Sequence, residues 1–501
     1  MVSILISLNL WAKMFSTSGY EPGLSVVVAE DGGIVIGGYT SGATSSDDFL
    51  AIKLDSIGNS VWSWCYGATS LPEDLSRIAK STDGGYLMAG SAYTPYDVIL
   101  VKINDAGNFV WGKNYIASNY EYTRSITGSS DGGCLITAAT SSFGNGFQIL
   151  LIKANASGDL QWTRCYGGSQ SDEPYGAIQT LEGGYAIIGG SNSFSGNNYR
   201  DVMVLKVDSA GRTVWGLSAG TTSEDVGYSI IQTPDSGYVI AGETQYLGNP
   251  NFLLIRLNRS GSLIWAKAYD WGASERATGV IQMPDGGYLI VGGRYVSGYS
   301  LAVVRTDTSG SPIWGGIFNG GQATAYPYGL AEAQDGSIVI AGEAGSGAAN
   351  NLLVLKMPTN GSYPGCLNAS NPLVVTMSLN STYPSETTSI CAMNQTSLTD
   401  RSRTPTLISS DLCTPLYENV EESLGNGFDF RVMGKGIYLF MPKEAQISLA
   451  IYDAQGRLVQ KLYDGVMSSG GHTFNPTLGT KGVYMAVLRY QGGMKSLKLI
   501  R

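Results

Sequence analysis

Carboxylates recur at one position of a repeated pattern, ten residues before a second acid that opens a turn. These residues are Glu21, Glu73, Glu121, Asp172, Asp225 and Glu275, and the seventh repeat has Ala325 there. Carboxylate oxygens bind hard cations and sugar hydroxyls. One interpretation is therefore that the repeats are arranged around a central channel and that these acids form a ring at its opening. The other is structural: each carboxylate accepts backbone N–H bonds or pairs with a basic residue of a neighbouring repeat. We favour the structural interpretation because a residue repeated around a fold usually serves the repeat.

The chain has a single histidine, His472, close to its C-terminus. The first 470 residues therefore contain no Ser-His-Asp triad, no Cys-His pair and no histidine-ligated metal site. We expect no cofactor and no metal, and no pair of carboxylates stands out for acid–base chemistry. Tyrosines of the connecting loops could stack against sugar rings or pack as strand residues. They include Tyr66, Tyr93, Tyr96, Tyr115, Tyr120, Tyr295 and Tyr326.

The composition excludes several classes of partner. The 501 residues carry a net charge of −9 and no basic patch, so we expect no nucleic-acid ligand. No apolar run reaches the length of about 18 residues that a transmembrane helix requires. Charged residues make up 14% of the chain and glycine supplies 67 positions, which is typical of many short strands joined by tight turns.

Two residue types keep the same period along the first 357 residues. The turn acids are Asp31, Asp83, Asp131, Glu182, Asp235, Asp285 and Asp335. The tryptophans are Trp11, Trp62, Trp111, Trp162, Trp215, Trp265 and Trp314. Both series have spacings of 48–53 residues, and each repeat reads as four short strands, which predicts a β-propeller. We expect each tryptophan to be a wedge between neighbouring blades.

The two ends of the repeat region complement each other. The seventh repeat runs to Lys356 and has no tryptophan, whereas Trp11 at the other end has no repeat of its own. We therefore predict an all-β fold: a seven-bladed β-propeller over residues 1–357, closed by the N-terminal strand and followed by a small β-sandwich. Closure leaves no unpaired sheet edge between the first and last blades.

The repeats resemble those of Gly-rich propellers found in secreted bacterial proteins. The shared pattern is Asp-Gly-Gly-Tyr-x-Ile-x-Gly, followed by Leu-x-Lys-x-Asp-x-x-Gly-x-x-x-Trp, and the resemblance covers residues 1 to about 360. We read residues 1–12 as mature structure, because Trp11 falls on the repeat. If the protein is secreted, its signal peptide is absent from this chain.

Composition changes after the seventh repeat. Residues 358–416 are rich in Ser, Thr, Asn and Pro, which predicts an extended linker or a small irregular module. Two of its three cysteines, Cys366, Cys391 and Cys413, could form a disulfide in an oxidising compartment. Cys65 and Cys165 hold the same position two repeats apart, so we expect them to fill the core.

The last segment, residues 417–501, alternates apolar and polar residues with frequent turns, which predicts a β-sandwich. It resembles the C-terminal sorting domain of type IX secretion cargo, through Tyr452 to Arg457, Gly471-His472, Lys481 to Tyr484 and a basic ending. The resemblance implies a sorting signal that includes Gly456, Arg457, Gly482, Tyr484, Lys495, Lys498 and Arg501. It implies type IX secretion machinery as a partner and makes His472 a sandwich residue.

These observations favour a secreted or cell-surface, monomeric propeller that acts as a non-catalytic binding or adhesion scaffold for an extracellular glycan or protein. The predicted location is extracellular or on the outer-membrane surface. The alternative is a secreted polysaccharide-active hydrolase or lyase that uses loop carboxylates and tyrosines. Blade lengths of 48–53 residues leave little chain for a dedicated catalytic loop, so they favour binding.

Overall fold

A computed structural model of the chain shows strands throughout and no helix among the residues it describes. None of those residues therefore belongs to a helix that could cross a bilayer. The chain divides into two compact units, Met1–Thr414 and Pro415–Arg501. The described residues are 11–16, 20–41, 47–67, 73–93, 96–143, 146–195, 199–318, 322–346, 349–361, 367–369, 372–382, 394–398, 408–413, 429–433, 436–441, 444–453, 458–474, 476, 483–490 and 493–500.

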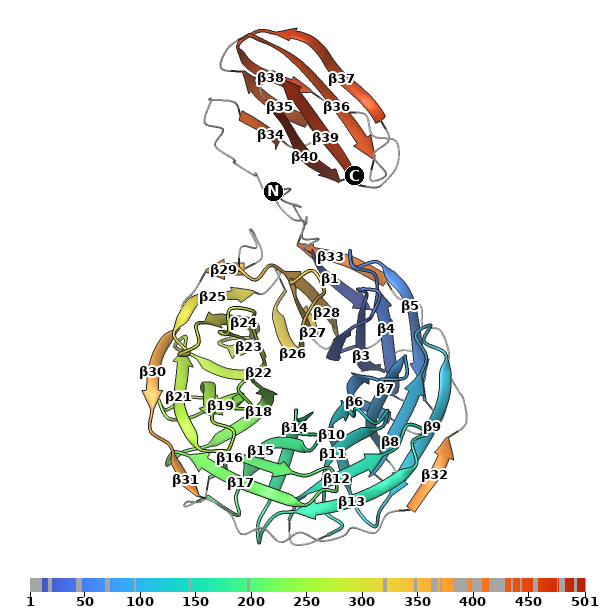
Figure 1. The fold of residues 1–501 in the computed structure, drawn as a ribbon, viewed down its shortest axis with the longest axis vertical. Helices are drawn as coiled ribbons and strands as arrows, with labels where there is room; N and C mark the ends of the chain where they lie inside the picture. The colour runs from blue at the N-terminus through green and yellow to red at the C-terminus, as the bar shows by residue number, and fades with distance from the viewer. Residues whose placement is uncertain are drawn as a thin grey trace. The chain divides into compact units, whose positions relative to one another are not determined.

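The first unit contains seven antiparallel sheets arranged in a ring (Figure 1). Six of them use four consecutive strands. These strands are β2 (Gly23–Val28), β3 (Ile34–Thr40), β4 (Asp48–Leu54) and β5 (Ser60–Tyr66); β6 (Glu73–Lys80), β7 (Tyr86–Tyr93), β8 (Tyr96–Ile103) and β9 (Phe109–Ile116); β10 (Glu121–Gly128), β11 (Cys134–Thr140), β12 (Gln148–Ala154) and β13 (Leu160–Tyr166); β14 (Asp172–Gln179), β15 (Tyr185–Ser191), β16 (Asp201–Val207) and β17 (Thr213–Gly220); β18 (Asp225–Gln232), β19 (Tyr238–Thr244), β20 (Asn251–Leu257) and β21 (Leu263–Asp270); β22 (Ser274–Gln282), β23 (Tyr288–Tyr295), β24 (Tyr299–Thr306) and β25 (Pro312–Phe318). The predicted all-β, propeller-type architecture is confirmed.

The remaining sheet of the ring joins the two ends of the repeat region. It consists of β26 (Thr324–Glu332), β27 (Ile338–Ser346), β28 (Ala349–Met357) and β1 (Trp11–Ser16). β1 runs antiparallel to β28, in a register that sets Trp11 opposite Lys356 and Phe15 opposite Leu352. In every sheet of the ring the first strand of the repeat lies nearest the centre (Figure 1).

Each of the seven repeat tryptophans lies against a turn glycine of the next sheet. The pairs are Trp11 with Gly58, Trp62 with Gly107, Trp111 with Gly158, Trp162 with Gly211, Trp215 with Gly261, Trp265 with Gly310 and Trp314 with Gly361. These glycines have φ between 71° and 82°, a left-handed conformation that other L-residues adopt at a cost. A β-carbon there would lie 2.5–2.9 Å from an indole carbon of the facing tryptophan. The predicted role of these tryptophans as wedges between sheets is confirmed.

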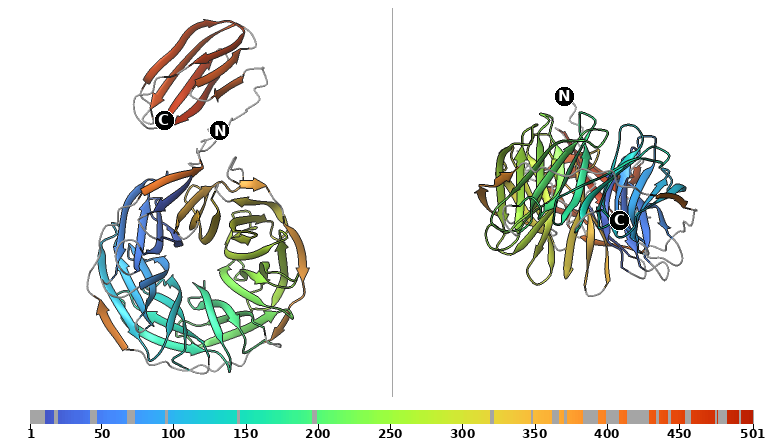
Figure 2. Two further views of the ribbon diagram at one scale, coloured as in Figure 1. Left: turned by 180° about the vertical axis from the view of Figure 1, so that it is seen from behind. Right: turned by 90° about the horizontal axis from the view of Figure 1, so that it is seen from below.

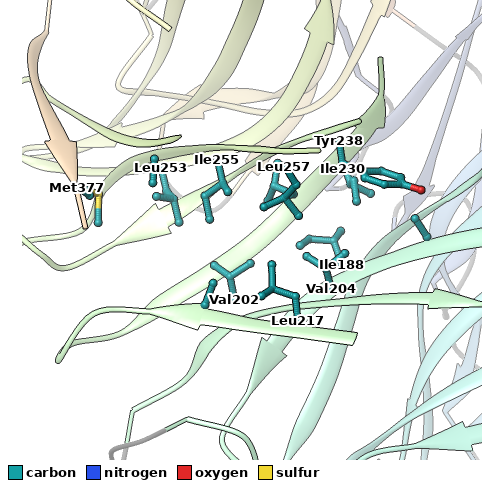
Figure 3. Packing of buried hydrophobic residues seen from close by; sticks show 14 of the residues in the cluster. Ile188, Val202, Val204, Leu217, Ile230, Tyr238, Leu253, Ile255, Leu257 and Met377 are labelled. Atoms are coloured by element: carbon teal, nitrogen blue, oxygen red, sulfur yellow. The ribbon is translucent and has the colours of Figure 1, made fainter. Parts of the chain in front are cut away.

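Apolar side chains fill the space between neighbouring sheets (Figure 3). In the cluster drawn there, Ile188, Val204 and Leu217 of one sheet face Leu253 and Ile255 of the next. All five are at most 1% exposed, and burial of such a side chain contributes about 1.5–3 kcal/mol relative to its exposure. The ring is therefore held together by a series of separate cores, one at each sheet-to-sheet interface.

Parts of the segment expected to be an extended linker or a small irregular module form short strands on the outside of the ring, here called the outer belt. Its strands are β29 (Leu367–Ala369), β30 (Leu373–Met377), β31 (Asn380–Thr382), β32 (Asn394–Leu398) and β33 (Ile408–Cys413). They pair with the outer strands β25, β21, β17, β9 and β1, respectively. Figures 1 and 2 both show these orange strands on the outside of the ring. An outer edge presents unpaired backbone groups, which short strands can satisfy without a hydrophobic period of their own.

Cys165 is buried in a hydrophobic core, as expected, and it is also disulfide-bonded. Cys65 and Cys134 are free and buried, so the expectation for Cys65 is confirmed.

The second unit has two antiparallel sheets that share one hydrophobic core. One sheet has β34 (Asp429–Met433), β35 (Gly436–Met441) and β38 (Gly470–Phe474), and the other has β37 (Leu458–Met467), β36 (Ala445–Asp453), β39 (Val483–Tyr490) and β40 (Gly493–Ile500). Leu439 of the first sheet and Leu449 and Leu488 of the second are fully buried in that core. A shared core between two sheets is the arrangement of a β-sandwich.

Candidate functional site

The carboxylates expected near a channel mouth are buried. Glu21, Glu121, Asp172, Asp225 and Glu275 are at most 1% exposed, and the side chain of Glu73, at the start of β6, lies outside the described residues. Hydroxyls donate to three of them, Thr40 to Glu21 at 3.1 Å, Thr140 to Glu121 at 2.8 Å and Ser193 to Asp172 at 2.6 Å. Backbone N–H groups donate to the other two, Thr221 to Asp225 at 2.6 Å and Ala273 to Glu275 at 3.1 Å. This geometry supports the structural interpretation and does not support a cation-binding collar.

These acids also join neighbouring sheets through their backbone. The N–H of Asp225 donates to the carbonyl of Arg200 at 2.8 Å, and that of Glu275 donates to Pro250 at 2.7 Å. Asp201, at the start of β16, carries a second carboxyl group into the same interface as Asp225. Burial, and next the charge of Asp225, raises the pKa of Asp201 to about 7. Burial likewise raises the pKa of Asp225. This interface therefore favours a proton on the carboxyl group of Asp201 well above the usual pKa of aspartate.

The innermost strand of every sheet in the ring has a β-bulge at the same place. The unpaired residues are Leu24, Ser76, Arg124, Tyr175, Tyr228, Thr278 and Tyr328. A bulge turns its extra residue out of the regular alternation of the strand. The residue type differs from sheet to sheet here, whereas the tryptophans and turn acids repeat. Because the residue type varies at the bulge while the rest of the framework repeats, we take the bulges and the space that they surround as the candidate site.

A cavity of about 170 Å³, the central cavity, lies among these innermost strands and is lined by all seven of them. Tyr175, Tyr228 and Tyr328 provide aromatic walls, and Ser125 and other small residues provide hydroxyl and backbone groups. Arg77 is the one charged side chain among the described residues of the lining. Its guanidinium donates to the carbonyl of Leu24 across the sheet interface at 3.0 Å. Burial lowers the pKa of Arg77, yet a guanidinium stays protonated at neutral pH.

Ion pairs between neighbouring sheets hold the tyrosines of the cavity in place. Arg124 pairs with Glu173 at 2.7 Å, and its guanidinium lies 5.4 Å from the ring centre of Tyr175. In the same way Arg276 pairs with Glu243 at 2.7 Å and lies 5.1 Å from the ring centre of Tyr228. A cation over an aromatic face contributes about 0.5–2 kcal/mol and fixes the orientation of the ring. The aromatic walls are therefore preorganised.

Two buried glutamates accept hydrogen bonds from tyrosines around the cavity. Glu243 accepts from the hydroxyl of Tyr228 at 2.8 Å, and Glu343 accepts from Tyr20 at 2.5 Å and from Tyr328 at 3.2 Å. Burial first, and the neighbouring glutamates next, raise the pKa of Tyr228 and of Tyr328 far above the usual range. These phenols stay protonated at neutral pH, where they can donate hydrogen bonds but cannot act as phenolate bases.

The sequence reasoning missed these two glutamates, although a signal was present. The equivalent positions at the end of the second strand in the other five sheets are Tyr39, Ser91, Ala139, Gly190 and Gly293. Four of those five residues are small because neighbouring sheets approach closely there. A glutamate at such a position departs from the repeat in a way that a comparison of repeats could have revealed.

The loop tyrosines divide into structural and clustered residues. Tyr66 and Tyr115 are buried, and their hydroxyls donate to carbonyls of the next sheet, at Gly107 and Gly158. Tyr96 and Tyr120 form a cluster with Tyr122, with ring centres 4.9–6.2 Å apart. The side chain of Tyr93 lies outside the described residues.

The last two loop tyrosines belong to a chain of four rings that leads to the cavity, here called the tyrosine track. Tyr295 lies 5.0 Å from Tyr299, which lies 4.8 Å from Tyr326, which lies 4.9 Å from Tyr328. The exposed fraction falls from 47% at Tyr295 to 43% at Tyr299 and 9% at Tyr326. The ring of Tyr326 lies directly on the backbone of Gly293, where a β-carbon would approach it to 2.1 Å. The track thus runs from solvent to the cavity wall.

The residues predicted for sorting lie in the second unit. Tyr484 pairs with Leu499 between β39 and β40, and Lys495 and Lys498 are in β40. Gly456, Arg457, Gly482 and Arg501 lie outside the described residues. His472 is in β38, where its ring bonds to the carbonyl of Ser468 at 2.9 Å. Throughout the described parts of both units, no three metal-ligating side chains come together.

Comparison with known proteins yields similarity of fold alone. No protein-family model and no curated protein matches the chain. A protein of unknown function from Dyadobacter fermentans is similar at 10% identity and a TM-score of 0.38, over 69% of this chain and 98% of that one. The polysaccharide lyase Uly1 is similar at 9% identity and a TM-score of 0.42, over 70% and 99%. The periplasmic gluconolactonase of Pseudomonas aeruginosa is similar at 10% identity and a TM-score of 0.36, over 73% and 99%.

Proposed function

We propose that residues 1–357 are a seven-bladed β-propeller closed by its N-terminal strand, and that it is a secreted, monomeric, non-catalytic scaffold that binds an extracellular ligand at the central cavity. Support for the closed ring comes from the pairing of β1 with β28. It comes also from Trp11, which lies against Gly58 as the other six tryptophans lie against their glycines.

The observation that carries the binding function is the set of inward-facing tyrosines on β-bulges. Tyr175, Tyr228 and Tyr328 surround one cavity and come from three different sheets. Aromatic faces combined with hydroxyl donors suit a polyhydroxyl ligand, because sugar rings present apolar faces and polar edges. Preorganised walls also reduce the entropy that is lost on binding.

Catalysis is disfavoured by the state of the ionisable groups around the cavity. Glu243 and Glu343 are at most 8% exposed and accept hydrogen bonds from tyrosines, and Glu243 is also paired with Arg276. A glycosidase requires two accessible carboxyl groups on either side of the scissile bond. The alternative, a secreted polysaccharide-active hydrolase or lyase, would require one of these groups to be released when substrate binds.

We also propose that the protein is exported to the outside of the cell or to the outer-membrane surface, and this proposal rests on the resemblance of the second unit to a type IX sorting domain. Its compact, separate core supports a domain that acts independently of the propeller. Deletion of residues 415–501 is expected to abolish appearance of the protein in the medium or on the surface. Normal export of the shortened chain would contradict the proposal.

Binding is tested with the full chain on a glycan array, followed by calorimetry on the glycans retained. Tyr175→Ala and Tyr228→Ala are expected to weaken binding about tenfold or more, as for aromatic residues at the centre of an interface. Tyr246→Ala is the matched control, since Tyr246 is 48% exposed in the loop between β19 and β20. The same glycans are assayed for release of products, and turnover of any of them would overturn the non-catalytic proposal.

A further inference from the structure

The central cavity has a positively charged lining. Arg77 faces it together with serine and threonine hydroxyls and three tyrosines, and the described lining contains no acidic side chain. A guanidinium in a confined, partly desolvated space binds an anion more strongly than the same group does at an open surface. Its planar donor array matches the two oxygens of a carboxylate or of a sulfate ester.

Arg77 stands at a position where the other sheets have small residues. The residue that follows each bulge in the remaining six innermost strands is Ser25, Ser125, Gly176, Ser229, Gly279 or Gly329. Six sheets therefore pack correctly with serine or glycine at this point. Arg77 is therefore a departure from the repeat that brings a charge to the cavity lining, in addition to its hydrogen bond to the carbonyl of Leu24.

The tyrosine track connects the cavity wall to exposed rings at the surface. Four rings lead from exposed Tyr295 to Tyr328 in the cavity wall, with successive centres 4.8–5.0 Å apart. The two exposed rings of the track, Tyr295 and Tyr299, suit stacking against sugar rings, whereas Tyr326 is buried between them and the cavity wall. The cavity, of about 170 Å³, suits a small group such as the terminal sugar ring of an oligosaccharide.

We propose that the tyrosine track and the central cavity bind the end of an acidic oligosaccharide, whose anionic group pairs with Arg77 while its preceding sugar rings lie on Tyr299 and Tyr295. This inference rests on the proposed function and specifies its ligand class. The anionic group is a carboxylate or a sulfate ester, two sources of the same chemistry that the experiment separates.

The test is calorimetry on the full chain with three oligosaccharides of equal length: tetragalacturonate, a sulfated galactan tetrasaccharide and neutral cellotetraose. The wild type is expected to bind one of the acidic probes about tenfold or more tightly than the neutral one. Arg77→Gln keeps a donor for the Leu24 carbonyl and is expected to remove this preference. Tyr299→Ser is expected to weaken binding of all probes that the wild type retains, by about tenfold.

Matched controls remove a similar group elsewhere. Arg212→Gln removes an exposed charge from the turn between β16 and β17, and Tyr246→Ser removes an exposed ring outside the track. Both are expected to bind as the wild type does. If Arg77→Gln does not fold, the acidic-ligand inference is decided by the ratio of the affinities for the acidic and neutral probes, measured in the wild type and in Tyr299→Ser.

The two proposals fail differently. Equal affinity for acidic and neutral probes, or a preference that Arg77→Gln leaves intact, overturns the acidic-ligand inference and leaves the binding scaffold in place. Absence of binding to every glycan overturns the proposed glycan-binding function and this inference with it. A preference for one acidic probe over the other identifies the source of the anionic group.

Discussion

Replacing Gly58 by alanine tests whether the N-terminal strand completes the ring. Gly58 has φ +82°, and a β-carbon there would lie 2.7 Å from the indole of Trp11. The left-handed conformation costs alanine about 1–2 kcal/mol. Crowding against the indole adds about 1–3 kcal/mol, as overpacking of a filled core does. We therefore expect Gly58→Ala to lower the free energy of unfolding by about 2–5 kcal/mol.

Two comparison variants separate the backbone cost from the steric cost. Gly183→Ala has φ +88° and no atom within 4 Å of the new β-carbon, so it should show the backbone cost alone. Gly261→Ala has φ +82° and approaches Trp215 to 2.8 Å, so it should match Gly58→Ala. In a Trp11→Ala background the steric term disappears, and Gly58→Ala should cost no more than Gly183→Ala does.

Urea unfolding followed by tryptophan fluorescence measures these differences. All nine tryptophans belong to the first unit, so the signal reports that unit in the full chain. The reasoning is refuted if Gly58→Ala costs the same as Gly183→Ala while Gly261→Ala costs more. In that case Trp11 does not lie against the first sheet, and closure by β1 is wrong.

Three further outcomes are expected. Asp201 holds a proton in the native state up to about pH 7, whereas an unfolded aspartate releases its proton near pH 3.9, so stability falls as pH rises between these values. Asp201→Asn should remove this fall in urea midpoints measured from pH 4 to 8, and identical pH slopes would contradict the assignment. Asp131→Ala should lower the free energy of unfolding by about 1–3 kcal/mol, because buried Lys153 loses a carboxylate 2.8 Å away; an unchanged urea midpoint would refute this role. Cys134, whose pKa burial raises to about 12, should resist iodoacetamide at pH 8 in the native protein and react in urea, as mass spectrometry would show; native alkylation would mean that the interface opens.

The ring architecture could be predicted from the sequence because its framework residues have the same task in every repeat. Each tryptophan must meet a glycine of the next sheet, so their types and spacing recur with little variation. The orphan Trp11 and the incomplete seventh repeat even pointed to the pairing of β1 with β28. A steric requirement of this kind can be recognised in the amino-acid sequence alone.

The environment of the repeated carboxylates was not visible in the same way. Their spacing indicates that they hold equivalent positions in the repeats, but it does not indicate how deeply their side chains are buried. The ligand-binding and the structural interpretation therefore both fit the pattern. A finer signal exists: a hydroxyl residue follows four of the acids by nineteen residues, as Thr40 follows Glu21 and Thr140 follows Glu121. A carboxylate with an assigned hydroxyl partner on the adjacent strand is more easily explained as structural than as a ligand site.

The strands of the outer belt could not be predicted from the sequence, because they form on the outer edges of sheets that other strands already provide. β29 and β31 have three residues each, too short for a periodic pattern, and their hydrogen bonds come from strands β25 and β17. The bulges of the innermost strands escaped prediction for a related reason. A bulge is a change of register between two strands, and neither strand reveals it alone.

The position of β1 has a consequence for the order of folding. Its neighbours on both sides, β28 and β33, are supplied by residues 352–356 and 408–413. The sheet is therefore complete only when almost 400 further residues of the chain are available to fold. Contacts of such sequence separation form slowly, and edges left open meanwhile are prone to aggregation unless they are shielded. Once both neighbours are in place, separating β1 from its sheet requires two rows of backbone hydrogen bonds to break together. The same strand that delays assembly should therefore slow unfolding and give the ring kinetic stability.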